Sequence, residues 1–253
     1  MILNSNLNEL ESFLCSINAH PKHKPLFLAL AQNIYDGEIP LRWGERQNDV
    51  RDNQLPGLFS YASLSEVKRN CEINGLTNDE KTYFLRRWFM SKCAKCVEHL
   101  FSLFPEVTPN ENHRDGNYDF IINNKHPFDL KSSVIPKEFR TTDSEIKDFI
   151  LNKNYGDGKP HWNRLIDFHY EHQSTGVRNR IQNRLFLTYH SFIAPERELF
   201  LRTNWEMHYY IIKDYLSNIT SKHPNFIKYN DVYADIIFFI EQKNGEITKK
   251  FCY

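Results

Sequence analysis

The sequence predicts an α/β protein in which helices flank a mixed central β-sheet. In the first hundred residues, apolar side chains recur mainly at helical spacing. A strand–turn–strand pattern then occupies residues 118–131, and helical and strand patterns alternate from there to the C-terminus. The chain has 253 residues, of which 40% are hydrophobic and 14% aromatic, so it can build a substantial core and is not expected to be disordered.

The N-terminal part is predicted to be helical. Apolar residues recur at helical spacing in the ranges 5–17, 25–35, 63–73 and 78–104. Ser63 followed by Glu66 forms a capping-box pattern at the start of the third helix, and Asn78 is the expected N-cap of the fourth. The polar stretch 41–60 is predicted to be a loop or arm.

Downstream of the strand–turn–strand, the patterns change from segment to segment. We expect a helix at 143–152, a loop at 155–160, a polar segment at 161–180, a strand at 184–190, a long amphipathic helix at 195–219, a strand at 233–241 and a last strand ending near residue 253. Residues 1–76 therefore form a helical N-terminal region or subdomain, and residues 77–253 form the α/β core.

One predicted β-hairpin is the most informative segment, because it brings two acids and a lysine together. Asp119 lies on the first strand, and an Asn-Asn pair supplies the turn, since Asn tolerates positive φ. Asp129 and Lys131 lie on the second strand, two residues apart, and so point to the same face. Such a surface can hold a hard divalent cation and activate a water molecule.

Context distinguishes this acid-x-Lys sequence from the others in the chain. Only Asp129-x-Lys131 follows a strand–turn–strand that carries another acid on its first strand. The long helix that precedes the hairpin supplies a third acid, Glu98, which lies beside Val97 and one helical position from Phe101. An acid at the border of an apolar stripe is placed to face the sheet.

The order helix Glu98, strand Asp119 and strand Asp129-x-Lys131 resembles the PD-(D/E)XK, or restriction-endonuclease-like, nuclease superfamily. In that family a helix glutamate, a strand aspartate and a following acid-x-lysine form the metal site. The resemblance covers residues 78–133, about a fifth of the chain. The chain departs from the family pattern in having a tyrosine, rather than a proline, before the first strand aspartate.

The resemblance implies a restriction-endonuclease-like fold and a particular metal site. Asp119 and Asp129 would hold one Mg²⁺, with the Leu130 carbonyl as a further oxygen ligand. Glu98 would complete the metal shell, directly or through water. Lys131 would position or help to deprotonate the attacking water, while the metal would stabilise the charge that builds on the scissile phosphate. Whether a second metal ion takes part is left open.

The same residues also have a structural interpretation. Asp129 and Lys131 can form an exposed charge pattern with Asp119 as a strand-end cap, and surface charge pairs contribute little stability. The neighbouring residues on both strands are strongly apolar, however, which predicts a central hairpin that is buried on at least one face. Buried carboxylates need partners or metals, so the metal-site interpretation is favoured.

The charge distribution is compatible with DNA as a partner. The chain has 32 basic and 32 acidic residues, which argues against a generic polyanion-binding surface but allows a local positive cleft. Residues 153–184 combine basic side chains with amides, the groups that contact bases and phosphates. The candidate DNA-contacting residues are Lys153, Lys159, Arg164, Gln173, Arg178, Arg180, Asn183 and Arg184. A solvated loop is the alternative, and Arg42, Arg46 and Arg51 with Trp43 are a second candidate clamp.

The expected activity is Mg²⁺-dependent hydrolysis of phosphodiester bonds in double-stranded DNA. A sequence-specific type II restriction endonuclease acting as a homodimer fits best, because a palindromic site matches a two-fold dimer. A DNA-repair or mobile-element nuclease of the same fold is one alternative, and a non-catalytic DNA-binding or interaction domain is another. No apolar run approaches membrane-spanning length and no signal peptide is evident, so a cytoplasmic protein without a membrane partner is expected.

Overall fold

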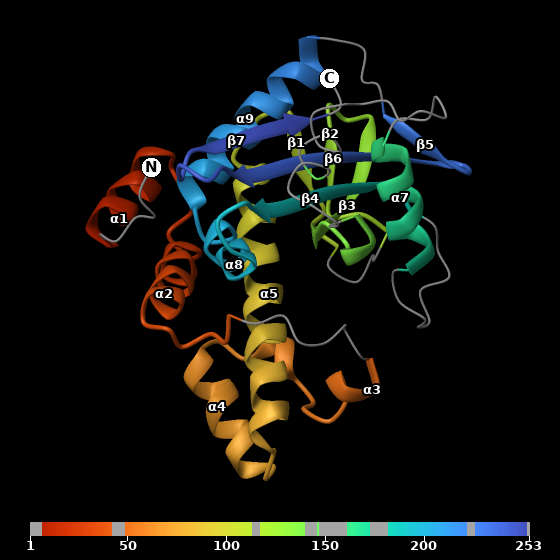
Figure 1. Cartoon of the computed structure of the whole chain (residues 1–253). Coiled ribbons are helices and arrows are strands. Elements are labelled where there is room, and N and C mark those ends of the chain that lie inside the picture. Colours follow the sequence, from red (N-terminus) through yellow and green to blue (C-terminus); the bar gives the residue numbers. More distant parts are fainter. Residues whose placement is uncertain are drawn as a thin grey trace.

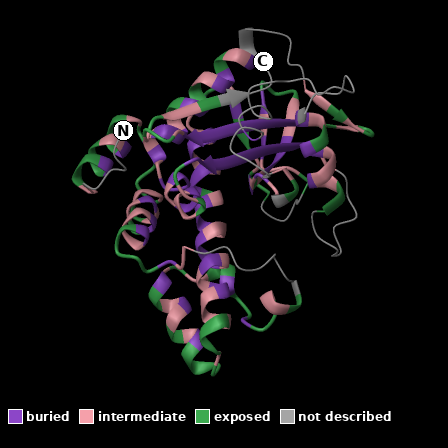
Figure 2. Cartoon of the chain, viewed as in Figure 1, coloured by how far each residue is buried: buried purple, intermediate pink, exposed green. Residues whose placement is uncertain are grey.

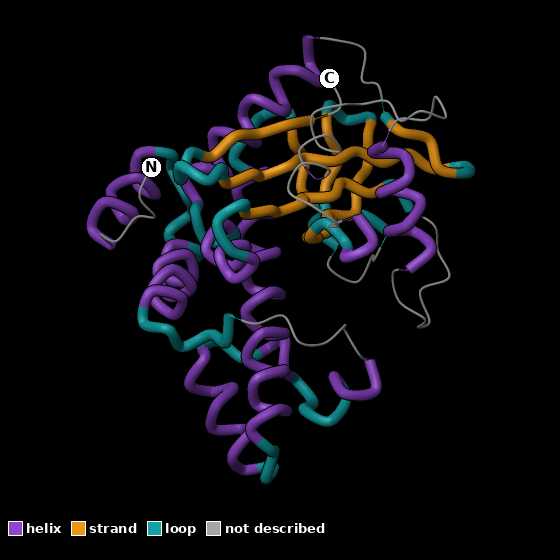
Figure 3. The backbone as a smooth tube through the Cα atoms, viewed as in Figure 1, coloured by secondary structure: helices purple, strands orange, loops and turns teal. Residues whose placement is uncertain are grey.

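The computed structural model of the chain describes residues 7–41, 49–112, 117–139, 146, 161–172, 182–221 and 226–251. It confirms the predicted α/β class, since a seven-stranded mixed sheet has helices on both of its faces (Figure 1). The described strands gather in one half of the molecule, and the other half consists of helices and loops (Figure 3).

The four predicted N-terminal helices are present. They are α1 (Leu7–Ser16), α2 (Lys24–Tyr35), α4 (Leu64–Ile73) and α5 (Asn78–Ser102). Ser63 caps α4 as predicted, since its hydroxyl accepts a hydrogen bond from the Glu66 N–H. The N-cap of α5 is Thr77 rather than the expected Asn78, because the Thr77 hydroxyl and the Glu80 carboxylate form a reciprocal capping box.

The described part of the polar segment between α2 and α4, residues 49–60, is more regular than the sequence predicts. It contains the short helix α3 (Asp49–Asp52) and the 3-10 helix η1 (Leu58–Ser60). Tyr83 and Arg87 of α5 both donate hydrogen bonds to the Asp52 carboxylate, with donor–acceptor distances between 2.6 and 3.0 Å. These contacts hold the segment against α5. They join residues far apart in the sequence, so local helix propensity could not predict them.

The sheet has the strand order β1–β2–β3–β4–β6–β5, and β7 also pairs with β6. The strands are β1 (Val107–Pro109), β2 (Phe120–Ile122), β3 (His126–Val134), β4 (Arg184–Ser191), β5 (Ile227–Tyr229), β6 (Val232–Glu241) and β7 (Ile247–Phe251). Strands β3, β4 and β6 are parallel, and the other pairs are antiparallel. The three-residue strands β1 and β5 are not expected from the sequence, because they are too short to carry a clear alternation.

Strands β2 and β3 form the predicted hairpin. Asn123 and Asn124 have φ angles of 53° and 54°, in the left-handed region that a two-residue hairpin turn requires. Phe120 pairs with Phe128 across the two strands. Asp119 lies one residue before β2, and its N–H donates to the Phe128 carbonyl at 2.8 Å, so the ladder continues through it.

Apolar side chains cover both faces of the parallel strands, which are among the most buried parts of the molecule (Figure 2). On one face, Leu185 and Leu187 of β4 belong to a core shared with α5 and with α9 (Trp205–Ser221). On the other face, Phe186 belongs to a second core shared with α7 (His161–His172). Burial on both faces explains why β6 is continuously apolar from Ile236 to Ile240.

The N-terminal helices and the sheet share one hydrophobic core. Phe27 of α2, Trp88 of α5 and Leu187 of β4 all belong to the same cluster of buried residues. The Trp205 indole N–H donates to the Phe27 carbonyl at 3.1 Å and so ties α2 to α9. Among the helices that the structure describes, none combines the length and the apolar character needed to cross a membrane.

The long helix expected at 195–219 is interrupted. Its range contains the 3-10 helix η3 (Pro195–Arg197), then α8 (Glu198–Leu201), and then α9 after a break. Within the break, Arg202 is buried and donates hydrogen bonds to the Ser132 hydroxyl and the Ser133 carbonyl of β3. The apolar periodicity continues across the break, so only these contacts with the sheet reveal it.

The polar segment expected at 161–180 begins with a helix instead. Helix α7 buries Trp162, Leu165 and Ile166 against the sheet, a spacing that is typical of an amphipathic helix. Its many His, Arg and Asn residues obscure this spacing in the sequence. The remainder of the segment, and the helix expected at 143–152 apart from the buried Ile146, lie outside the described residues.

Candidate active site

Asp129 and Lys131 form an ion pair on β3. They share a face of the strand, as their spacing predicts, and the Lys131 ammonium donates a hydrogen bond to Asp129 Oδ1 at 2.6 Å. Asp129 is 8% exposed, while the Lys131 side chain is 25% exposed. The pair therefore lies at the boundary between the core and solvent, where a ligand can reach it.

Asp119 approaches the same pair from the neighbouring strand. Its Oδ2 accepts a hydrogen bond at 2.7 Å from the N–H of Leu130, the residue between Asp129 and Lys131. Burial raises the pKa of Asp119, and the nearby Asp129 carboxylate raises it further, while the Leu130 N–H acts in the opposite direction. The hairpin thus brings two carboxylates close enough for each to feel the charge of the other.

Glu98 reaches this group electrostatically from α5. The side chain is half-buried, and burial raises its pKa to about 7. The negative charge of Asp119 adds to this increase, whereas Lys95 and Lys131 oppose it. Helix α5 packs against β3, which is why a glutamate in its second half senses both aspartates of the hairpin.

Arg184 is a close neighbour of Asp129 rather than an exposed DNA contact. The two residues are paired in register on the parallel strands β3 and β4, and both are 8% exposed. The Arg184 Nε lies 3.6 Å from Asp129 Oδ2. The guanidinium carbon lies 4.8 Å from the centre of the Tyr170 ring of α7, a cation–π arrangement.

The other expected DNA contacts fall into three groups. Asn183 is engaged within the sheet: its amide nitrogen donates to the Pro127 carbonyl at 3.2 Å, and its amide oxygen accepts from the Tyr233 N–H at 2.8 Å. Arg164 is exposed on α7. Lys153, Lys159, Gln173, Arg178 and Arg180 lie outside the described residues.

Only part of the second candidate clamp is described. Arg51 lies on α3, with its guanidinium carbon 5.2 Å from the centre of the Tyr83 ring. Arg42, Trp43 and Arg46 lie outside the described residues. Of the clamp residues, the structure therefore places only Arg51, which packs against Tyr83 of α5.

Tyr170 and Tyr229 are not among the site residues expected from the sequence. Their rings stack with centroids 4.3 Å apart and planes within 6° of parallel, and the Tyr170 hydroxyl donates to the Gln182 carbonyl at 2.7 Å. Tyr170 thereby forms a fixed platform beneath Arg184. Its place on the sheet-facing side of a helical pattern is the only sequence signal that could have indicated it.

The donor atoms suit a hard cation such as Mg²⁺. Asp119 and Asp129 offer carboxylate oxygens from one hairpin, and Mg²⁺ readily binds two carboxylates with water as its other ligands. Within the described ranges, no three His, Cys, Asp or Glu side chains form a group that could hold a metal by themselves. Glu98 is thus not joined to the two aspartates in such a group, and water or substrate oxygens would have to supply the remaining ligands.

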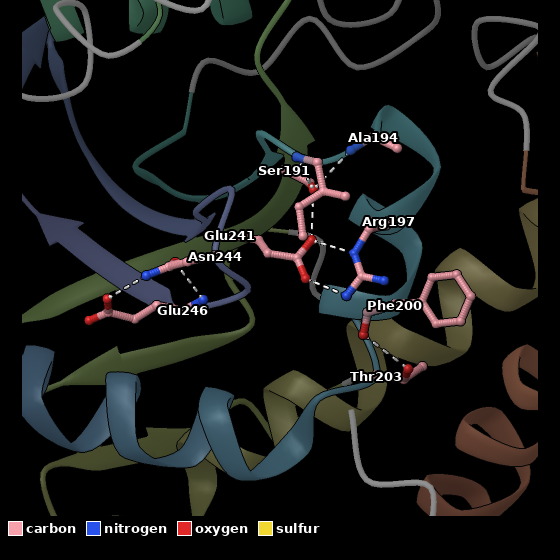
Figure 4. A network of polar contacts seen from close by, with 9 residues as sticks. Ser191, Ala194, Arg197, Phe200, Thr203, Glu241, Asn244 and Glu246 are labelled. Carbon is pink, nitrogen blue, oxygen red and sulfur yellow. Dashed lines mark hydrogen bonds and ion pairs between the residues drawn. The ribbon is translucent and has the colours of Figure 1, made fainter. Parts of the chain in front are cut away.

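A second polar cluster lies at the opposite end of β4 and β6 and has a different character (Figure 4). The Glu241 carboxylate accepts hydrogen bonds from the Ser191 hydroxyl at 2.6 Å and from the Arg197 Nε at 2.7 Å. A third hydrogen bond comes from the Arg197 Nη2. Ser191 in turn accepts from the Ala194 N–H at 3.4 Å. These groups satisfy one another, so this cluster fastens η3 to the strand ends.

Comparison with known proteins does not place the chain in a family: no family model matches it, and no curated protein or solved structure is significantly similar to it.

Proposed function

We propose that this chain is a Mg²⁺-dependent endonuclease of the restriction-endonuclease-like type that hydrolyses phosphodiester bonds in double-stranded DNA. The observation that carries the proposal is the hairpin geometry. Asp119 is hydrogen-bonded to the backbone between Asp129 and Lys131, so two carboxylates and an ammonium group converge at one partly exposed place. Glu98 on the preceding helix adds a third acid within electrostatic range.

Each residue has a role in this proposal. Asp119 and Asp129 would bind Mg²⁺, with the Leu130 carbonyl nearby, and Mg²⁺ when bound supplies positive charge for the scissile phosphate. Lys131 would orient the attacking water and hold a proton during its attack. Glu98, whose pKa of about 7 lets it exchange a proton near neutral pH, would complete the site through water.

A type II restriction enzyme is the form of this activity that we favour. One core joins the N-terminal helices to the sheet, and such a compact enzyme would cut both strands of a palindromic site as a homodimer with two copies of one active site. Its substrate, double-stranded DNA, would be met in the cytoplasm.

A second candidate function is a DNA-binding or interaction domain whose acids are structural. It is favoured by the protein partners that the acids already have. Both Asp129 oxygens lie near a cation, and Asp119 accepts a backbone hydrogen bond. Such contacts alone can stabilise partly buried carboxylates without any metal.

Cleavage of DNA separates the two candidates. The purified full chain is incubated with mixed plasmid and phage DNA in Mg²⁺, beside reactions with EDTA and with Asp129→Ala. We expect discrete fragments that disappear in both of these reactions. Asp79→Ala is the matched control, because Asp79 also begins an acid-x-Lys sequence but is exposed at the start of α5, and this variant should cleave normally.

The opposite result is equally clear. If folded protein with Mg²⁺ or Mn²⁺ cleaves neither modified nor unmodified DNA, the nuclease proposal fails. The acids at the hairpin are then structural, and binding of labelled DNA duplexes without cleavage would support the second candidate.

A further inference from the structure

Arg184 is a buried cation beside the proposed active site, and its surroundings differ from those of a DNA-reading arginine. It begins β4 directly alongside Asp129 of β3 and is only 8% exposed. An arginine that reads base edges or phosphates must present its guanidinium to the DNA surface. The burial of Arg184 therefore argues for a role inside the protein.

The contacts of the Asp129 carboxylate indicate what this role is. Lys131 donates a hydrogen bond to Oδ1 at 2.6 Å, and Arg184 Nε lies 3.6 Å from Oδ2. The two cations thus face different oxygens of one carboxylate. If Arg184 keeps Oδ2 oriented, Oδ1 is the oxygen left toward Lys131 and the more open side of the site.

Arg184 is itself held in place from behind. Its guanidinium lies over the Tyr170 ring, which stacks on Tyr229 and is anchored by its hydroxyl to the Gln182 carbonyl. The backbone adds a further link, because the Asp129 N–H donates to the Asn183 carbonyl at 2.9 Å. A chain of contacts therefore connects β5, through α7 and β4, to β3, the strand that carries Asp129 and Lys131.

We infer that Arg184 is a positioning residue, which fixes the orientation of the Asp129 carboxylate from the α7 face of the sheet and does not contact DNA. This inference rests on the proposed nuclease function. It assigns to Arg184 an effect on the chemical step, since a small misplacement of a catalytic group lowers the rate without weakening substrate binding.

Steady-state cleavage by Arg184→Met, Arg184→Lys and Arg197→Met tests the inference. Arg197→Met is the matched control, because Arg197 forms an Arg–carboxylate pair with Glu241 at the other end of β4 (Figure 4). We expect Arg184→Met to lower kcat by roughly 10- to 100-fold while KM for DNA changes by less than about twofold. Arg184→Lys, which keeps the charge, should recover part of kcat, and Arg197→Met should leave kcat unchanged.

Three outcomes would overturn the inference. A raised KM with a shallower salt dependence would make Arg184 a phosphate contact instead. A kcat equal to that of the wild type, or a loss that Arg197→Met shares, would show that Arg184 does not orient Asp129. Absence of cleavage by the wild-type chain would remove the nuclease proposal and this inference together, whereas the other two outcomes leave the nuclease proposal standing. Thermal unfolding of each variant identifies any that fail to fold, and Tyr170→Leu, which removes the platform, then replaces Arg184→Met.

Discussion

An arginine–carboxylate pair lies at each end of strand β4, and the two pairs differ in how well they are hydrogen-bonded. At the C-terminal end, Arg197 and Ser191 together donate three hydrogen bonds to Glu241. At the N-terminal end, Arg184 Nε lies 3.6 Å from Asp129 Oδ2 and has no hydrogen-bond partner in the part of the chain that the structure describes. The Glu241 carboxylate is therefore hydrogen-bonded to its cation, whereas the contact between Arg184 and Asp129 is too long to be a hydrogen bond.

This difference separates a structural pair from a candidate functional one. A buried pair whose groups are all hydrogen-bonded has no capacity left for a ligand. The Asp129 end combines an incompletely bonded arginine with two further acids, Asp119 and Glu98, whose pKa values are raised. An incompletely bonded arginine beside carboxyl groups with raised pKa values is typical of a site that binds something else.

The largest effect on cleavage is expected for Lys131, which lies beside Asp129 at the N-terminal end of β4. Lys131→Ala should lower the cleavage rate by about 10²- to 10⁴-fold, the usual contribution of a positioned acid–base group. Because the variant also loses the hydrogen bond to the buried Asp129 carboxylate, the free energy of unfolding should fall too, and rates are therefore compared per folded molecule. Rates are measured with Lys81→Ala as the control, since Lys81 closes the acid-x-Lys sequence at the start of α5. A rate within a few-fold of the wild type would exclude Lys131 from the chemistry.

At the C-terminal end of β4, substitution of Glu241 should change the stability of the protein rather than the cleavage rate. Glu241→Ala leaves Arg197 and Ser191 without their acceptor and should lower the free energy of unfolding by about 3 kcal/mol. Urea denaturation measures this loss, and cleavage per folded molecule should stay unchanged. If Glu241→Ala is as stable as the wild type, the pair does not fasten η3, and the contrast between the two ends is lost.

A smaller, pH-dependent effect is expected for Glu98. Its pKa of about 7 lies above the ordinary value of 4.5, so between these values the folded state binds more protons than the unfolded chain. The stability that Glu98 contributes is therefore present below pH 4.5 and is lost as the pH rises through 7. The unfolding free energy of the wild type, relative to Glu98→Gln, should fall by on the order of 2 kcal/mol across this range.

Denaturation in EDTA at a series of pH values measures the Glu98 effect without metal. Subtracting the Glu98→Gln values removes the titration of the other groups, which the two proteins share. A difference that does not vary with pH would mean that burial does not hold Glu98 near neutral pH, and its proposed role in proton exchange would fall.

The smallest effect is expected away from both ends of β4. Thr77→Ala removes the side-chain cap of α5 and should lower the free energy of unfolding by about 1 kcal/mol. Cleavage should be unaffected, because Thr77 lies at the opposite end of α5 from Glu98. Thermal unfolding and cleavage assays check both statements. A reduced cleavage rate would indicate that loss of the cap at the start of α5 disturbs the site near Glu98.

The hairpin and its acid-x-Lys pair were predictable because they depend on neighbours in the chain. The Asn-Asn turn needs only the tolerance of Asn for positive φ, and the common face of Asp129 and Lys131 needs only the period of a strand. The same holds for α1, α2, α4 and α5, whose bounds follow from apolar spacing. The capping residue of α5 was misplaced by one position, since Thr and Asn are both good caps.

The role of Arg184 was not predictable in the same way. The sequence places it in a polar, basic segment, which favours a DNA contact. Pairing of β3 with β4 instead puts it beside Asp129, and α7 covers it with Tyr170. The break in the helix at Arg202 has a similar origin, because its partners Ser132 and Ser133 lie far away in the sequence.

Local order in this protein thus follows from the sequence: the α/β class, most of the helices and the hairpin are set by side-chain periodicity and turn chemistry over a few residues. The environment of each charge was decided by the tertiary structure alone. Strand pairing and helix packing determine whether an arginine is hydrogen-bonded to the carboxylate beside it, as Arg197 is to Glu241, or lies near one without a hydrogen bond from its Nε, as Arg184 does near Asp129. Burial and the charges of distant neighbours likewise set the pKa of Glu98, because desolvation and Coulomb interactions depend on distance in space and not on distance along the chain.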